Sequence, residues 1–355
     1  MKILSEMILE IDDRNERKKI EFFNNVDLML KYDAVGSVFS FSFYFNPENP
    51  NHVFLAGVGR YQLVRIYENN ELLLTGFILN YTFSSKSIKE LVNISGYSVP
   101  GVLEDSQIPL NAYPLQSDGL TLRQIATKLL RPFKIIFEVD NSVSSLMDKP
   151  FETTTAGATD TVKDYICSLA TQLDIVVSHN EKGHLLFTKA NTNSVPIISF
   201  TDQIPSYSAS FSVNGQGMHS PITVLKQQED DENAGQYVLR NIYVPDFTTA
   251  FRPKVVIQSS GDDTTTEKVA KAILANELKS IQLKVNLSTW IINSKIIKPN
   301  QTIEIQNKNL FIFEKTKMFI ESVSFKGDEK GNTCELTCVL PECYNGKVPE
   351  RNIFL

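Results

Sequence analysis

The stretch Ser37-Val-Phe-Ser-Phe-Ser-Phe-Tyr-Phe45 alternates aromatic side chains with small polar ones. Because successive side chains of a β-strand point to opposite faces, the phenylalanines share one face and the serines share the other. This period of two predicts an antiparallel strand with one buried face. The same stripe could serve as a ligand platform, but any barrel wall shows this alternation, so we favour a core role for Phe39, Phe41, Phe43 and Phe45.

Further strands are expected directly after this stretch. Tyr61 to Tyr67 and Glu71 to Phe83 are rich in apolar residues and flank Glu68-Asn69-Asn70. Asparagine tolerates the backbone of a tight turn, so the pattern predicts a hairpin. A third strand is expected from Ile88 to Tyr97. Such a meander is typical of sheets that close into barrels, so residues 1–105 are predicted to form a first, all-β domain.

Residues 106–192 are predicted to form a small α+β module. Thr121-Leu-Arg-Gln124 has the spacing of a capping box, and Pro132 should end the helix that it opens. A short strand is expected from Lys134 to Glu138. The apolar face of this helix comprises Leu122, Ile125, Ala126, Leu129 and Leu130.

The module is expected to continue with a second helix and a hairpin. Thr159 or Asp160 is placed to cap this helix. The sequence Asn180-Glu-Lys-Gly183 suits a turn between two strands, Asp174 to Ser178 and His184 to Lys189. The apolar residues of the helix are Val162, Ile166, Leu169, Ala170 and Leu173.

A second β-rich domain is predicted over residues 193–355. Thr264-Thr-Thr-Glu267 forms a capping box for a helix near 265–280, and the acidic run Gln228 to Gly235 predicts a mobile, solvated loop. Lys326 to Gly331 is expected to make the last hairpin connection. The predicted strands are Pro196–Thr201, Ser206–Val213, Ile222–Gln227, Ile281–Trp290, Gln301–Gln306, Leu310–Phe313, Met318–Phe325 and Thr333–Leu340. The predicted fold class is therefore mainly β with an α+β module.

Composition excludes several classes of protein. With 355 residues, 42% apolar and 21% charged, the chain should fold into two or three domains. The first 20 residues lack the apolar segment of a secretory signal, and the apolar stretch Leu72–Leu79 is too short to span a bilayer. Four cysteines suit synthesis in a reducing cytoplasm. A net charge of −6 disfavours nucleic-acid binding through phosphates.

Convergent groups that would carry catalysis are not evident in the sequence. The four histidines, His52, His179, His184 and His219, stand in unrelated contexts. His179 and His184 flank one predicted turn, but no third metal ligand accompanies them. We therefore predict no catalytic, cofactor-binding or metal site.

The cysteines and glycines also have simple structural explanations. Cys334 and Cys338 alternate with Leu336 and Leu340, which favours core packing over metal binding. Cys343 follows closely, whereas Cys167 lies on a distant predicted helix. The fragment Gly57-Val-Gly59-Arg60 precedes a strand and lacks a third glycine, so it indicates a turn and not a phosphate loop.

Trp290 is the single tryptophan of the chain. Tryptophan is enriched among the residues that anchor protein interfaces. Burial in the core is the simpler interpretation, and both remain open from the sequence.

The order of these segments resembles the baseplate hub proteins of Mu-like contractile phages. Two strand motifs of that family, "xxLTGxI" and "xxVxGxS", are matched by Leu72-Leu-Leu-Thr-Gly-Phe-Ile-Leu79 and Leu91-Val-Asn-Ile-Ser-Gly-Tyr-Ser98. The family's next helix and its "RPFxI" motif are matched by Leu120 to Ala126 and by Arg131-Pro-Phe-Lys-Ile135. The helix and hairpin that follow in the family correspond to Thr161 to Thr188. The closing barrel is matched by Val285–Trp290, Ile297–Ile305, Phe319–Phe325 and Leu340-Pro341. Ile204 to Gly261 matches least.

This resemblance implies a structural, non-enzymatic protein of the virion tail, made in the cytoplasm of the bacterial host. It implies that residues 1–105 and 193–355 form two tube-like β-barrel domains. It further implies a homotrimer whose paired barrels join a hexameric tail tube to a three-fold central spike. The implied partners are the tube or distal tube protein, the spike, other baseplate proteins and a tape-measure protein, around a channel for the genome. An acidic chain suits a channel that does not retain DNA. The alternatives are a receptor- or carbohydrate-binding tail protein and a cell-wall hydrolase, which would need a carboxylate pair or a zinc site.

Overall fold

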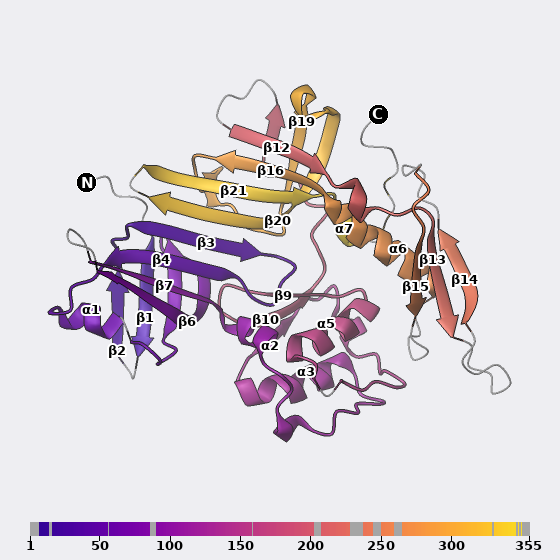
Figure 1. Cartoon of the computed structure of the whole chain (residues 1–355), viewed down its shortest axis with the longest axis horizontal. Coiled ribbons are helices and arrows are strands. Elements are labelled where there is room, and N and C mark those ends of the chain that lie inside the picture. Colours follow the sequence, from indigo (N-terminus) through magenta and orange to yellow (C-terminus); the bar gives the residue numbers. More distant parts are fainter. Residues whose placement is uncertain are drawn as a thin grey trace. The chain divides into compact units, whose positions relative to one another are not determined.

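The computed structural model describes residues 7–13, 16–55, 57–85, 90–157, 159–201, 207–227, 237–243, 250–258, 265–328, 330–345, 347 and 349. The chain divides into two compact units (Figure 1). The first comprises Met1–Lys189, Leu287–Ile291 and Ser322–Glu335, and the second comprises Ala190–Asn286, Ile292–Glu321 and Leu336–Leu355. Strands predominate and the helices are small, so the predicted fold class, mainly β with helices, is confirmed.

An antiparallel sheet forms the β-part of the first unit. Its strands follow the order β3-β4-β7-β6-β5-β1-β2, and the second half of β20 pairs with β3. The strands are β1 (Ile8–Asp13), β2 (Glu16–Ile20), β3 (Asn25–Lys31), β4 (Val38–Tyr44), β5 (Leu63–Glu68), β6 (Glu71–Ser85), β7 (Glu90–Ser98) and β20 (Ile312–Asp328). A short helix, α1 (Pro50–Leu55), precedes β5.

Strand β4 is the phenylalanine-serine stretch, and its two faces differ as predicted. Phe39, Phe41 and Phe43 are buried in the core of the first unit. On the other face, the hydroxyls of Ser40 and Ser42 each lie 3.0 Å from Oδ1 of Asn93 on β7. The core role predicted for Phe39, Phe41 and Phe43 is therefore confirmed, whereas Phe45 lies beyond β4 and is only partly buried.

The hairpin between β5 and β6 is also confirmed. Asn69 and Asn70 adopt positive φ angles of 48° and 63°. A two-residue turn with positive φ at both positions matches the twist of the flanking strands. Asparagine accepts this backbone conformation at low cost.

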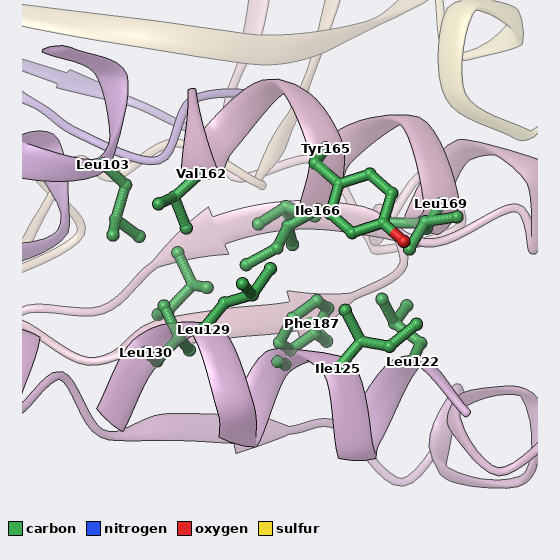
Figure 2. Packing of buried hydrophobic residues seen from close by; sticks show 14 of the residues in the cluster. Leu103, Leu122, Ile125, Leu129, Leu130, Val162, Tyr165, Ile166, Leu169 and Phe187 are labelled. Atoms are coloured by element: carbon green, nitrogen blue, oxygen red, sulfur yellow. The ribbon is translucent and has the colours of Figure 1, made fainter. Parts of the chain in front are cut away.

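The α+β module follows β7 and has its own apolar core. Its elements are α2 (Val102–Asp105), α3 (Leu122–Leu130), β8 (Phe137–Val139), α4 (Ser144–Met147), α5 (Val162–Gln172), β9 (Val176–His179) and β10 (Leu185–Thr188). Strand β10 lies between β9 and β8. Figure 2 shows side chains from α3, α5 and β10 meeting in one cluster, among them Ile125, Leu129, Ile166, Leu169 and Phe187.

Capping chemistry sets the start of both module helices. The Thr121 hydroxyl accepts a hydrogen bond from Gln124 N, and the Gln124 side-chain oxygen accepts one from Thr121 N, so the predicted capping box is confirmed. The second helix was expected to start at Thr159 or Asp160, but its cap is Thr161, whose hydroxyl accepts from Asp164 N at 3.1 Å. The Asp160 carboxylate instead accepts from Gly157 N in the preceding loop.

The β8 strand begins three residues later than predicted. A 3-10 turn, Arg131–Phe133, follows α3. Lys134 then adopts a left-handed conformation, with φ 56°. This residue reverses the chain, so the strand starts only at Phe137.

The second unit contains small sheets and one longer helix. Its elements are β11 (Ser199–Thr201), β12 (Tyr207–Val213), β13 (Ile222–Gln227), β14 (Tyr237–Tyr243), β15 (Lys254–Gln258), α6 (Thr266–Glu277), β16 (Ile281–Leu287), β17 (Ile291–Ile292), β18 (Lys295–Ile296), β19 (Thr302–Asn307), the first half of β20, the end of β21 (Gly331–Val339) and α7 (Glu342–Asn345). Strand β19 pairs with β11 in parallel and with β20 in antiparallel fashion. A three-stranded sheet has the order β14-β13-β15.

Several predicted elements of this unit have different limits. Helix α6 is capped by Thr265, whose hydroxyl accepts from Lys268 N, while Thr264 lies outside the described residues. Strand β16 ends at Leu287, so Trp290 is not on it. The strands expected at Leu310–Phe313 and Met318–Phe325 are one strand, β20. The predicted acidic loop, Gln228–Gly235, lies outside the described residues.

Among the helices that the structure describes, none has the length and apolar character needed to cross a membrane.

Candidate functional site

The four histidines each have their own environment. His52 Nδ1 accepts a hydrogen bond from Asn46 N at 2.9 Å. His219 Nδ1 lies 2.7 Å from Oε1 of Glu277, which also receives Lys254 Nζ at 2.9 Å. Within the described parts of the chain, no three His, Cys, Asp or Glu side chains are grouped so as to hold a metal ion.

His179 and His184 flank one turn but have separate partners. His179 Nδ1 lies 3.0 Å from the carbonyl oxygen of Ala34. Burial lowers the pKa of His179, so the neutral ring donates this hydrogen bond. His184 Nδ1 lies 2.7 Å from Glu138 Oε1, and this contact lowers the pKa of Glu138. Each ring is thus engaged by its own hydrogen-bond partner.

The cysteines are parts of apolar packing. Cys334 and Cys338 are fully buried beside Leu336 on β21, as their alternation predicted. Burial raises the pKa of Cys334 to about 12, and burial also raises the pKa of Cys167 to about 12. Neither thiol has the thiolate character that reactive or metal-binding cysteines need.

Trp290 is buried within the first unit. Its indole Nε1 donates a hydrogen bond of 2.8 Å to the carbonyl oxygen of Thr333. Its ring meets Phe325 edge to face, with centroids 5.5 Å apart. The core interpretation of Trp290 is therefore correct.

The fragment Gly57–Arg60 forms a turn, with Arg60 N donating to Gly57 O at 3.0 Å. The buried Gln62 amide fixes this turn: its Oε1 accepts from Gly57 N and its Nε2 donates to Phe54 O. The turn presents Val58 and Tyr61 to solvent. This segment, Gly57–Gln62, is called the Gln62 loop below.

An exposed aromatic pair lies between β19 and β20, which sequence reasoning missed. Phe311 and Phe313 are 56% and 43% exposed, and their rings meet edge to face with centroids 5.0 Å apart. Phe311 adopts φ 62°. For a bulky residue this left-handed conformation is a true outlier, and such strain concentrates at functional positions. The segment Asn307–Phe313 is called the aromatic turn below.

Hydrogen bonds hold the aromatic turn in one conformation. The Asn307 side chain accepts from Asn309 N at 3.0 Å and donates to Tyr207 Oη at 3.0 Å. Gln306 Nε2 donates to the carbonyl oxygen of Phe313 at 2.9 Å. Rigid aromatic side chains lose little entropy on binding and dominate interface energetics. The aromatic turn is thus the best candidate for an anchor of protein–protein contact.

Comparison with solved structures defines the class of fold. The 43 kDa tail protein of prophage MuSo2 from Shewanella oneidensis aligns with a TM-score of 0.78 and 19% identity, over 96% of this chain and 100% of that one. A tail protein from Neisseria meningitidis aligns with a TM-score of 0.76 and 15% identity, over 96% and 99%. The chain has the fold of these phage tail proteins along nearly its whole length.

A family model places part of the chain more narrowly. Residues 101–189 match the second domain of baseplate hub proteins of the gp44-like family. The chain therefore carries a gp44-like baseplate hub domain, and the predicted resemblance to phage hub proteins is confirmed. A comparison with curated proteins gave no match.

The same fold occurs outside phage tails. The c3393 protein of Escherichia coli aligns with a TM-score of 0.56 and 12% identity, over 97% of this chain and 80% of that one. It is described as a component of the type VI secretion system with structural similarity to the T4 tail proteins gp27 and gp5.

Proposed function

We propose that this chain is the structural hub of a phage tail baseplate. One observation carries the proposal: its fold matches tail proteins over 96% of the chain, and residues 101–189 carry a hub domain. Three copies form a ring that joins the hexameric tail tube to the three-fold central spike, with an opening through which the genome passes. The task is mechanical, and we assign no catalysis to it.

The proposed partners follow from this position in the tail. They are further copies of the chain, the tube or distal tube protein, the central spike, other baseplate proteins and a tape-measure protein. The aromatic turn supports the proposal, because two rigid, exposed rings suit the centre of an interface. In this account the protein is made in the bacterial cytoplasm and resides in the virion.

We also propose a division of the chain into three functional parts. Residues 1–105 and 193–355 supply the two tube-like β-domains, whose duplication lets three chains meet six tube subunits. Residues 106–192 supply the module with its own core of buried side chains from α3, α5 and β10. The module is fixed to the β-part of the first unit through hydrogen bonds of Thr75 and His179.

Co-expression with neighbouring tail proteins tests this function. The chain should co-purify with both the tube protein and the spike protein of the same tail. The Phe311→Asn variant should keep its fold and lose affinity for its assembly partner, whereas the Tyr61→Asn variant, its matched control, should keep both. Binding to glycans, with no affinity for tube or spike, would instead support a receptor-binding tail protein.

A further inference from the structure

The edge strand β15 differs from β2, which stands at one end of the sheet of the first unit. Strand β2 carries Glu16, Arg17, Lys18 and Lys19, and Arg17 pairs with Asp12 at 2.7 Å. Charged edges of this kind prevent pairing with other chains. Strand β15 has one charged residue, Lys254, and its ammonium is bound to Glu277 at 2.9 Å. Its edge therefore lacks this protection.

Hydrogen bonding shows which backbone groups of β15 face outward. Lys254 N donates to the carbonyl oxygen of Pro221, so residue 254 points its backbone groups toward β13. Because these directions alternate along a strand, Val255 and Ile257 point theirs away from β13. Among the described residues, no strand lies on that side of β15.

The side chains at this edge are apolar and exposed. Val255 and Ile257 are 61% and 57% exposed, and Ile242 on β14 is 52% exposed. Thr223 on β13 is the register partner of both Ile242 and Val255, so these three share one face of the sheet. Ile222 and Val224 are buried on the opposite face, where α6 packs over β13 and β14.

We propose that β15 pairs with β15 of a second copy of this chain, antiparallel about Val256, to make a continuous six-stranded sheet. In this register Val255 lies opposite Ile257 of the partner, and their outward N–H and C=O groups form the new hydrogen bonds. Lys254 lies opposite Gln258 of the partner, so no like charges meet. The contact has two-fold symmetry, the commonest symmetry among protein oligomers. The proposed pairing of β15 does not depend on the proposed hub function.

Oligomeric mass provides the first test. A proline at position 255 removes an N–H that β13 does not use, and edge strands tolerate proline at such positions. Val255→Pro should therefore halve the mass of the full-length protein in light scattering. Ile257→Lys should do the same if the proline variant folds poorly. Ile242→Lys is the matched control, since it changes the same face away from the edge, and its mass should stay that of the wild type.

Position-specific cross-linking provides the second test. Val256 would face Val256 of the partner in a non-hydrogen-bonded pair, with Cα atoms about 4.5 Å apart, within disulfide reach. Two cysteines at position 255 would be diagonal neighbours about 7–8 Å apart. Oxidised Val256→Cys should form a covalent dimer, whereas Val255→Cys and the wild type should not. The proposal would be overturned by equal cross-linking at positions 255 and 256, or by no cross-linking at position 256. It would also be overturned if Val255→Pro and Ile257→Lys both kept the mass of the wild type. A tail protein that binds the edge while the chain fails to self-associate would also overturn it.

Discussion

The hydroxyl of Thr75 on β6 donates a hydrogen bond of 2.8 Å to the carbonyl oxygen of Glu181 in the β9–β10 turn. This contact joins residues 106 positions apart and fixes the module to the β-part of the first unit. Thr75 is buried, so Thr75→Val leaves the Glu181 carbonyl without its donor and should cost about 1 kcal/mol of unfolding free energy. Urea unfolding measures this loss. Thr171→Val is the control: it removes an exposed hydrogen bond of 2.8 Å from the Thr171 hydroxyl to Cys167 O, and it should lower the unfolding free energy by less.

Gly183 lies in the same turn and adopts φ 80°. A Cβ there would approach Val99 Cγ2 at 3.0 Å and Thr75 O at 3.3 Å. Gly119, with φ 70°, has open space around its Cα. Gly119→Ala should therefore cost about 1 kcal/mol from backbone strain alone. Gly183→Ala should cost about 1–2 kcal/mol more from crowding, and equal losses in thermal or urea unfolding would contradict this packing.

The stability of the first unit should depend on pH through His179. Burial lowers its pKa in the folded protein below the usual 6.5. As the pH falls below 6.5, the unfolded chain takes up a proton that the folded state still excludes, so the free energy of unfolding falls. His179→Gln can still donate to Ala34 O and should reduce this slope between pH 6.5 and 5. Thr75→Val is the control, since it removes a contact of the same β9–β10 turn but no titratable group, and it should leave the wild-type slope unchanged. Denaturant titrations at several pH values make the comparison.

Phe311 in the aromatic turn should lower the stability of the fold and strengthen assembly. Asparagine tolerates the left-handed conformation better than phenylalanine, so Phe311→Asn should leave the unfolding free energy unchanged or raise it by up to about 1 kcal/mol. The same change removes an interface anchor and should weaken assembly by about 2 kcal/mol, roughly 30-fold. Tyr61→Asn in the Gln62 loop is the matched control, since Tyr61 is also exposed at positive φ, with φ 50°. It should relieve strain without changing assembly, as measured by sedimentation.

Local signals in the sequence predicted much of the first unit. The Thr121 capping box, the Asn69-Asn70 turn and the alternation in β4 each depend on residues a few positions apart. Their interactions are therefore visible in a short window of sequence. The Thr161 cap was missed because three adjacent polar residues could each have served, and tertiary contacts decided among them.

Non-local features were harder to predict. Strands β14 and β15 flank β13, and the parallel pairing of β15 with β13 joins segments about 30 residues apart. The strands predicted at Leu310–Phe313 and Met318–Phe325 are one strand, β20, because pairing with β19 continues through the polar residues between them. The aromatic turn was missed because nothing in the local sequence predicts a left-handed phenylalanine at position 311.

Electron microscopy of the purified full-length protein tests the central claim most directly. The hub account predicts rings with three-fold symmetry and a central opening, alone or joined in pairs through β15. Particles of a single chain at every protein concentration, or closed assemblies without three-fold symmetry, would contradict it.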